Sequence, residues 1–253
     1  MEREETVSIV MPVFNAAPYL REAAESVRNQ TWQDWELLMV DDHSRDDSRR
    51  IMEELAREDG RIRLFSTGEG EKGAADARNL GTRHAAGRYL AFLDSDDLWM
   101  ADKLEKELAF LRQKEAAVVF TSYEFGDEEA RGTGKVVRAP QCLTYQKALS
   151  RTVIFTSTVL FDLEKIPKEL LYMPRVASED TATWWQILRA GYCAYGLEDT
   201  LTVYRRPQKS LSSNKLAAVS RIWNLYRRQE KLSLVRSAWH FCFWALFATL
   251  RRI

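Results

Sequence analysis

The sequence predicts an α/β fold built on an open, mostly parallel β-sheet with helices on both faces. Short apolar runs alternate with amphipathic segments of helical length through the first half of the 253-residue chain. Connections of that length between successive strands favour parallel pairing with right-handed crossovers, which place helices over both faces of a sheet. With 45% apolar and 29% charged residues, the composition is that of a globular protein that can build a core.

The first elements follow this alternation closely. Residues 7–12 are almost wholly apolar and predict a buried strand, and residues 36–41 repeat the pattern. Between them, residues 16–29 carry apolar side chains at helical spacing, as residues 46–58 do after the second strand. The same order then predicts strands at 61–65, 89–94 and 117–123 and helices at 74–86 and 103–113.

The second half of the chain is less regular. Residues 124–140 are polar and contain glycine, which favours a loop or an irregular hairpin. Residues 152–161 are rich in β-branched side chains and predict a strand, and two acids open a predicted helix at 179–190. A last short strand is expected at 201–204. The remaining ranges suggest two units, an α/β domain at 1–213 and a helical tail at 214–253 with a break near Leu232 or Ser233.

Charge is distributed unevenly along a chain that is neutral overall. The 37 Lys and Arg residues balance 37 Asp and Glu residues, so a basic field that would attract nucleic acid over the whole molecule is not expected. Residues 1–200 carry a net charge of −10, whereas the chain from Leu201 onward carries +10. The C-terminal end is therefore the part that should attract anions.

Cysteine usage and hydropathy indicate the compartment. Cys142, Cys193 and Cys242 lie far apart without a C-x-x-C pair, and no histidine stands at metal-ligand spacing from them, which argues against a zinc site. This sparse, odd cysteine count and the acidic residues 1–5 argue against secretion, so we expect a reducing cytoplasmic compartment. The longest uncharged stretch, 237–250, has 14 residues, short of the roughly 20 that a membrane-spanning helix needs.

Acidic residues follow two of the predicted strands at the point where each strand ends. Asp41 and Asp42 follow the second strand, and Asp94, Asp96 and Asp97 follow the fourth. Ligands of open α/β sheets bind beyond the carboxyl ends of the strands, and a hard cation such as Mg²⁺ or Mn²⁺, shared with substrate phosphates, would gather such carboxylates. The alternative is that Asp41 and Asp97 cap the helices that follow.

A glycine-containing loop at 68–73 opens the helix expected at 74–86. It has neither the spacing of a G-x-G-x-x-G motif nor that of a P-loop. Even so, the amino terminus of a helix with Arg78 one turn inside could hold a diphosphate through backbone amides and a charge-assisted hydrogen bond. The alternative is a mobile surface loop ahead of a packing helix.

Six motifs occur in a fixed order along the chain. They are VSIVMPVFN at 7–15, QTWQDWE at 30–36, VDDHS at 40–44, Gly73 with ARNLG at 77–81, GRYLAFLDSDD at 87–97 and SED at 178–180. Together they resemble the motifs of the family 2 glycosyltransferases, which have the GT-A fold. The resemblance extends from residue 7 to residue 215, and stretches at 194–198 and 204–215 resemble the bacterial branch that makes teichuronic acid, capsule and lipopolysaccharide sugars.

The resemblance implies a nucleotide pocket at the ends of the first two strands. Pro12, Val13 and Asn15 would line this pocket. Asp41 or Asp42 would hydrogen-bond the base, which in this family is most often uracil. The implied donor is therefore a nucleoside diphosphate sugar, with UDP as the expected nucleotide.

The resemblance also assigns residues to the diphosphate and the metal. Arg78 would approach the diphosphate, and Asp94 and Ser95 would lie near the ribose and phosphates. Asp96, the last residue of the D-x-D triplet, would contact Mn²⁺ or Mg²⁺ together with Asp94. Arg205 opens a basic, hydroxyl-rich segment, with Arg206, Lys209 and Ser210 to Ser213, that would either close over the diphosphate or lie solvated at the surface.

A separate carboxylate is needed for the reaction itself. Inverting transfer requires deprotonation of an acceptor hydroxyl opposite the leaving diphosphate, so the base must stand apart from the metal. The resemblance makes Asp180 that base, with Glu179 beside it; the alternative is that both acids only compensate the helix dipole. One of Trp184 and Trp185 could face a sugar ring, although core packing of both is the interpretation that their helical position favours.

The tail combines an apolar stripe with basic residues. Trp239, Phe243, Leu246 or Phe247, and Leu250 recur at helical spacing, and six Arg or Lys residues flank them. Such a helix suits the anionic inner surface of the cytoplasmic membrane. The resemblance implies a polyprenyl-diphosphate-linked acceptor, which would lie in that membrane. The alternative is a stripe that docks on the catalytic domain or on a second subunit.

Together these features predict a metal-dependent inverting glycosyltransferase of the cytoplasmic membrane face, which transfers a sugar from a UDP-linked donor to a saccharide or lipid-linked acceptor. Two other classes remain as alternatives. A phosphotransferase with Asp94 as nucleophile is disfavoured because the triplet follows the fourth strand rather than the first. A non-catalytic subunit that binds nucleotide sugars or assembles at a membrane is disfavoured because all the predicted acids are present.

Overall fold

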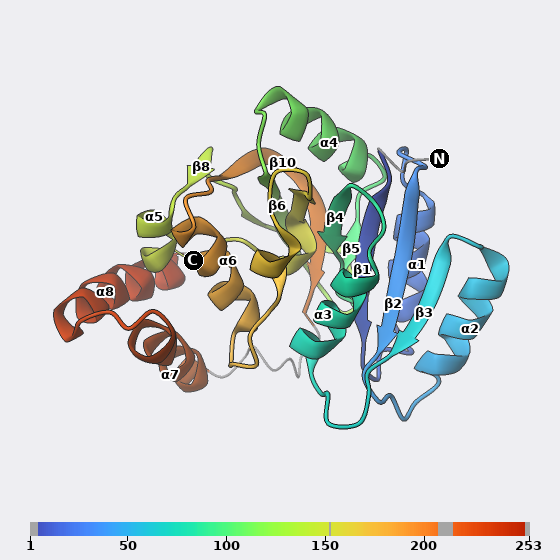
Figure 1. The fold of residues 1–253 in the computed structure, drawn as a ribbon, viewed down its shortest axis with the longest axis horizontal. Coiled ribbons are helices and arrows are strands. Elements are labelled where there is room, and N and C mark those ends of the chain that lie inside the picture. Colours follow the sequence, from blue (N-terminus) through green and yellow to red (C-terminus); the bar gives the residue numbers. More distant parts are fainter. Residues whose placement is uncertain (1–4, 152, 207–214, 251–253) are drawn as a thin grey trace.

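The computed structural model describes residues 5–151, 153–206 and 215–250, and its strands form one mixed sheet with helices on both faces (Figure 1). The strands are β1 Val7–Val13, β2 Trp35–Asp41, β3 Ile62–Ser66, β4 Tyr89–Phe92, β5 Leu98–Trp99, β6 Val118–Gly126, β7 Gly132–Val137, β8 Cys142–Leu143, β9 Val159–Asp162 and β10 Ala194–Arg205. Their order is β3-β2-β1-β4-β9-β6-β10-β5, with β7 beside β6 and β8 beside β10.

The core lies in two layers because successive side chains of a strand point to opposite faces of the sheet. Ile9 and Leu37 belong to a cluster under α1 (Leu20–Arg28), α2 (Ser48–Glu58) and α4 (Lys103–Gln113). Val10 and Leu38, the next residues of the same strands, belong to the cluster on the other face. That face is covered by α3 (Ala74–His84), α5 (Tyr145–Ser150) and α6 (Glu179–Arg189).

The first half of the chain confirms the predicted parallel sheet. β3, β2, β1 and β4 are all parallel, and their register pairs Val13 with Asp41 and Val10 with Phe92. The carboxyl ends of β1, β2 and β4 therefore meet at one edge. Each predicted helix in this half is present with bounds that differ by a few residues, the largest difference being α1, which begins at Leu20 after a turn.

The second half departs from simple alternation. β9 runs antiparallel between β4 and β6, and it begins only at Val159 because a 3₁₀ turn occupies Thr156–Thr158. Thr152, where a strand was expected to start, lies outside the described residues. The polar stretch after β6 forms the irregular hairpin with β7. β10 is far longer than the expected 201–204. Register shifts against β6 interrupt the alternation of its side chains, so the sequence pattern did not indicate most of the strand.

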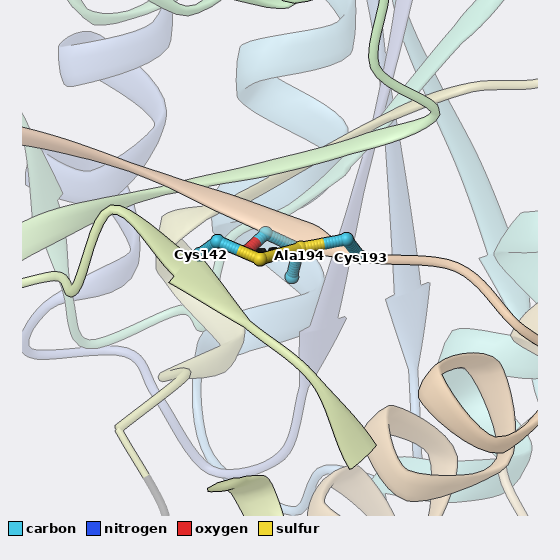
Figure 2. Close-up of a disulfide and its surroundings, with 3 residues drawn as sticks. All are labelled: Cys142, Cys193 and Ala194. Carbon is cyan, nitrogen blue, oxygen red and sulfur yellow. Dashed lines mark hydrogen bonds between the residues drawn. A yellow bond between two sulfur atoms is a disulfide. The ribbon is translucent and has the colours of Figure 1, made fainter.

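A disulfide joins Cys142 to Cys193 beside the sheet (Figure 2). β8 pairs antiparallel with the start of β10, opposing Cys142 to Tyr195, which brings Cys193 next to its partner. The two cysteines are 51 positions apart in sequence, so their spacing did not predict the bond. The bond also does not fit the reducing compartment expected from the cysteine count, because disulfides are rare there. Cys242 is a free, exposed thiol.

The C-terminal segment is helical with a break, as expected. α7 (Lys215–Asn224) continues into a π-helical turn, Leu225–Gln229, and α8 (Leu234–Leu250) follows after residues 230–233. α8 lies beside α5, at the opposite end of the molecule from α2 and β3 (Figure 1). Within the described ranges, every helix is too short or too polar to cross a lipid bilayer.

Candidate active site

The loops after β1 and β2 are tied to each other at the carboxyl edge of the sheet. The Asn15 amide donates to Ser44 Oγ (3.1 Å), and Asn15 Oδ1 accepts from the Arg45 amide (2.8 Å). Asn15 is exposed and adopts a left-handed backbone with φ 48°, a conformation that costs energy and is often found at functional sites. Pro12 is half-buried, but Val13 is fully buried and its carbonyl accepts from the Asp42 amide (2.8 Å), so Val13 does not line an open pocket as expected.

The two acids that end β2 are nearly buried and hold the surrounding loops in place. Asp41 Oδ1 accepts from the Ser44 amide (3.1 Å). Asp42 accepts from the Thr67 hydroxyl (3.1 Å) and from the Gly73 amide (2.8 Å), so it fastens the glycine-containing loop to the end of β2. Asp47 occupies the N-cap position of α2, so the interpretation of Asp41 as a helix cap is wrong.

Asp97 also shapes a loop and caps no helix. Its carboxylate is fully buried, accepts from the Ser157 hydroxyl (2.5 Å) and from the Arg205 amide (3.2 Å), while α4 has Asp102 at its N-cap position. Burial and the neighbouring acids Asp96 and Asp94 raise the pKa of Asp97 well above its usual range. Ser157 Oγ in turn accepts from the Asp94 amide (3.1 Å), which fixes the D-x-D segment against the 3₁₀ turn before β9.

Asp94 and Asp96 remain as the partly exposed acids of the triplet, with Ser95 nearly buried between them. Burial and the charge of Asp94 raise the pKa of Asp96 to about 6. A bound cation would relieve this repulsion, and two carboxylates fit Mg²⁺ or Mn²⁺ when substrate phosphates supply further oxygens. Among the described residues no group of three or more acids, histidines or cysteines could hold a metal alone, so the pair fits a metal that arrives with the nucleotide.

Arg78 links the acids after β4 to the start of α6. Its guanidinium donates to Asp94 Oδ1 (2.5 Å) and to Glu179 Oε1 (3.0 Å), and it is almost completely buried. Burial alone would lower its pKa, but Asp94 and Glu179 outweigh that effect and raise the pKa above its usual value. Gly81 allows this approach, because a Cβ there would lie 2.3 Å from Val10 Cγ1 and would force α3 away from β1.

Asp180 lies in the first turn of α6 beside this ion pair. The helix starts from Ser178, whose left-handed backbone (φ 62°) is unusual for a non-glycine residue. Asp180 Oδ1 accepts from the Thr181 amide (2.6 Å). Burial and the charge of Glu179 raise the pKa of Asp180, whereas the hydrogen bond and Arg78 oppose that rise. A carboxylate with a raised pKa, near the acid pair but outside it, has the properties of a general base.

The structure corrects two of the predicted substrate contacts. Trp184 is buried and stacks on Phe161 (5.9 Å between ring centres), so it packs in the core as Trp185 does and offers no ring face to a sugar. Arg205 is only 2% exposed. Its guanidinium donates to the Asp96 carbonyl (2.8 Å), the Glu128 carbonyl (2.7 Å) and Glu22 Oε2 (2.6 Å), so it positions the D-x-D segment and does not face a diphosphate. The basic segment from Lys209 to Ser213 lies outside the described residues.

Two polar residues of the site were not predicted from sequence. Ser157 lies in a segment that looks like ordinary strand, yet it orders both Asp94 and Asp97. Asn79 exchanges two hydrogen bonds with the backbone of Met173 (2.7 and 2.8 Å), which fixes the chain leading to α6. The ARNLG motif at 77–81 was the available signal for Asn79.

The D-x-D pair, the buried arginine and the acid-rich start of α6 form one site, and the sequence was compared with those of known protein families. The family described as "Glycosyl transferase family 2" matches residues 8–161, more than half of the chain. The chain belongs to glycosyl transferase family 2. It is therefore a glycosyltransferase, and the expectation drawn from the six motifs is confirmed.

Two relatives match this glycosyltransferase over most of their length. The putative teichuronic acid biosynthesis glycosyltransferase TuaG of Bacillus subtilis strain 168 is 38% identical over 248 residues, 98% of this chain and 97% of that protein. WfgD of Escherichia coli, named as UDP-Glc:alpha-D-GlcNAc-diphosphoundecaprenol beta-1,3-glucosyltransferase, is 38% identical over 220 residues, 87% of this chain and 84% of that protein.

Solved structures place the fold among the GT-A glycosyltransferases. Residues 1–349 of Staphylococcus aureus TarS, in complex with UDP-GlcNAc, superpose with a TM-score of 0.71 at 17% identity, over 95% of this chain and 71% of that one. The mannosyltransferase PcManGT of Pyrobaculum calidifontis, in complex with GDP-Man and Mn²⁺, gives 0.72 at 20% identity, over 95% and 73%. At these identities the likeness concerns the fold alone.

Proposed function

We propose that this enzyme transfers one hexosyl or N-acetylhexosaminyl group, with inversion, from a UDP-linked donor to a saccharide or polyprenyl-diphosphate-linked acceptor, using Mg²⁺ or Mn²⁺. The observation that carries the proposal is the Arg78 bridge between Asp94 and Glu179. It brings the acids after β4 and the acids of α6 to one edge of the sheet, although 84 positions separate Asp96 from Asp180. A donor and an acceptor bound at that edge would meet.

Each group has a distinct task in this reaction. Asp94 and Asp96 would hold the cation, which supplies positive charge to the leaving diphosphate. Arg205 holds the Asp96 backbone in place. Asp180 takes the proton from the acceptor hydroxyl. The hydroxyl oxygen of the acceptor forms a bond to the anomeric carbon of the donor sugar as the bond between that carbon and the diphosphate breaks. Arg78 pairs with Glu179 (3.0 Å), the residue before Asp180, and so holds the start of α6 beside Asp94.

The choice of donor and acceptor rests on the relatives. WfgD, whose name states a UDP-glucose donor and a diphosphoundecaprenol acceptor, covers 87% of this chain, and TarS was solved with UDP-GlcNAc. Asp41 and Asp42 lie at the end of β2, where a base would be held if the nucleotide binds as proposed. These observations favour a UDP-sugar and a lipid-linked acceptor over other pairs.

We also propose that residues 1–213 form the catalytic domain and that the tail at 214–253 contacts the inner face of the cytoplasmic membrane. Support comes from α8, where Leu234 and Val235 are exposed beside the exposed Arg236. In vesicle flotation, wild type should rise with anionic vesicles, and a variant with Lys231→Glu and Arg236→Glu should not. Equal flotation of both proteins would end the proposal.

The activity is tested by calorimetric titration with UDP and Mn²⁺, followed by assay of donor hydrolysis. Binding with hydrolysis supports the transferase, binding without hydrolysis supports a non-catalytic subunit, and the absence of binding overturns both. Asp96→Ala should weaken UDP binding roughly tenfold or more in Mn²⁺ and leave it unchanged in EDTA. Asp199→Ala, at an exposed ion pair with Lys106, is the matched control. Metal-independent UDP binding by wild type would contradict the metal role of the pair.

A further inference from the structure

A groove with a cavity volume of about 610 Å³ lies between α5 and α8. The two helices lie side by side at the end of the molecule farthest from α2 (Figure 1). Pockets that enclose an organic ligand usually measure about 300–1,000 Å³, so this groove is large enough for one. It is distinct from the edge that carries Asp94 and Asp96, because none of the acids of the candidate active site lines it.

One wall of the groove is an aromatic track along α8. Trp239, Phe243 and Phe247 line the groove and recur at intervals of four residues, so they share one face of the helix. At 1.5 Å per residue, this face extends over about 12 Å. Trp239 is 63% exposed and Phe243 36% exposed, and their rings lie 5.0 Å apart. Apolar side chains gathered around a cavity in this way mark a binding surface more often than scattered ones do.

These exposed rings are not simply the outer side of a loosely attached helix. α8 is fixed to α5 by a hydrogen bond between His240 Nδ1 and Ser150 Oγ (2.8 Å). Ser237 and His240 are buried, and Phe241 and Trp244 pack against the main core. The docked side of α8 is therefore already satisfied by the protein, and the aromatic track is a second apolar side.

The other wall is cationic. Lys147 and Arg151 lie one helical turn apart and line the groove, and the Arg151 guanidinium stands 5.7 Å from the Phe247 ring. None of the described residues that line the groove is acidic, and neither α5 nor α8 contains an Asp or Glu. Glu230, which precedes α8, is paired with Arg189. A ligand with a hydrocarbon chain and a phosphate head matches an apolar wall beside a cationic one.

The groove lies near α6, which carries the candidate base, because α5 packs against both α6 and α8. A small cavity of about 10 Å³, with room for no more than a water molecule, shares Leu143 and Arg151 with the groove. Thr181, which follows Asp180 in α6, also lines this small cavity. A lipid whose head lies near Arg151 would therefore place an attached sugar on the side of the molecule that carries α6.

We propose that the groove between α5 and α8 binds the polyisoprenyl chain of a lipid-diphosphate acceptor, with the diphosphate near Lys147 and Arg151. This inference rests on the proposed function, since it names where the acceptor of that transferase is held. It also gives the aromatic track a role that a flat membrane-facing helix would not need. A bilayer surface requires exposed apolar side chains all along the lipid side, whereas a single chain requires a walled groove.

The test is calorimetric binding of farnesyl diphosphate to the full chain, with UDP and Mn²⁺ present at saturation to occupy the nucleotide site. Trp239→Ala and Phe243→Ala should each weaken binding roughly tenfold or more, because the lost ring removes apolar surface from contact with the chain. Val235→Ala and Leu246→Ala are the matched controls, since both side chains are exposed on α8 (80% and 52%) and neither lines the groove. These controls should bind like wild type.

A charge variant completes the test. Lys147→Glu should weaken farnesyl diphosphate binding, and Lys165→Glu, at an exposed position away from the groove, should not. Equal affinity of wild type, Trp239→Ala and Lys147→Glu would overturn the proposal. It would also be overturned if the protein binds lipid vesicles but not farnesyl diphosphate, and if the Val235 and Leu246 variants lose vesicle binding as much as the groove variants do.

The same titrations separate this inference from the proposed function. Trp239→Ala should keep the UDP affinity and donor hydrolysis of wild type, because Trp239 lies outside the nucleotide edge. If Trp239→Ala binds UDP normally and also binds farnesyl diphosphate as tightly as wild type, only the groove proposal is wrong. Failure of wild type to bind UDP would defeat the proposed function whatever the lipid result.

Discussion

The two sides of the sheet are held in place by different kinds of contact. On the side of β1, β2 and β3, strands that follow one another along the chain pair in parallel, and hydrogen bonds to Asn15, Asp41 and Asp42 fix the loops that follow them. On the side of β6 and β10, order depends on partners far apart in sequence, including the antiparallel β9, the Cys142–Cys193 bond and the packing of α8 on α5. The comparison teaches that the side we propose to bind the nucleotide (the nucleotide side) is held largely by consecutive elements, whereas the side we propose to bind the acceptor (the acceptor side) is assembled from distant segments.

The largest expected effect comes from removing the proposed base on the acceptor side without changing the nucleotide side. Asp180→Asn keeps the shape of the side chain but cannot accept a proton, so transfer should fall by about 10³-fold. UDP affinity should stay within about twofold, because the nucleotide would be held by the other side of the site. Transfer rates and UDP titration measure the two effects.

Asp199→Asn, at an exposed ion pair with Lys106, provides the control and should keep full activity. Full turnover of Asp180→Asn would remove Asp180 as the base. Loss of UDP binding together with transfer would break the division between the two sides.

A second test compares buried and exposed arginines across the two sides. Arg205→Met should destabilise the fold by about 3 kcal/mol, because it leaves the Asp96 and Glu128 carbonyls and Glu22 without their buried donor. Arg49→Met should cost less than about 1 kcal/mol, since its ion pair with Glu53 is exposed on both sides (71% and 53%). Urea unfolding of the three proteins gives both values, and equal losses would contradict the argument.

Reduction of the disulfide should affect the acceptor side. Opening the bond between Cys142 and Cys193 should lower the free energy of unfolding by about 2 kcal/mol or more, because the unfolded chain regains the freedom of a long closed loop. UDP binding should be unchanged. Thermal unfolding with and without reductant measures the loss, and the variant Cys142→Ala should match reduced wild type; an unchanged midpoint would refute the contribution.

The smallest expected effect concerns pH. Because burial and Glu179 raise the pKa of Asp180, this proposed base should become protonated at a higher pH than an ordinary aspartate. Transfer should therefore decline, as pH falls, earlier than it would with a solvent-exposed aspartate, while UDP binding at saturating Mn²⁺ should follow a different profile. A pH-rate curve whose acid limb lies at the usual aspartate pKa would contradict the buried setting of this carboxylate.

The same division explains how much the sequence could predict. Strand periodicity placed Asp41, Asp42, Asp94 and Asp96 at one edge, because the ends of parallel strands coincide. Neither alternative for Arg205 anticipated its burial, which depends on Glu22 and on a loop after β6. The core packing favoured for Trp184 is confirmed by its stacking on Phe161.

Other features left no signal along the chain. The disulfide and the role of Ser157 arise only when segments more than 50 positions apart meet. The short strands β5 and β8 were missed because two residues carry no periodicity. Sequence patterns predict structure formed by neighbouring residues, whereas the acceptor side depends mainly on contacts between distant segments.

The covalent bond in Figure 2 also sets the connectivity of the molecule. It closes the chain from Cys142 to Cys193 into a ring that contains α5, β9 and α6, together with Glu179 and Asp180. A protease that cuts once inside this ring leaves both fragments joined, so the nicked protein still migrates as one species until a reductant is added. The segment that carries the proposed base is thus tethered at both of its ends.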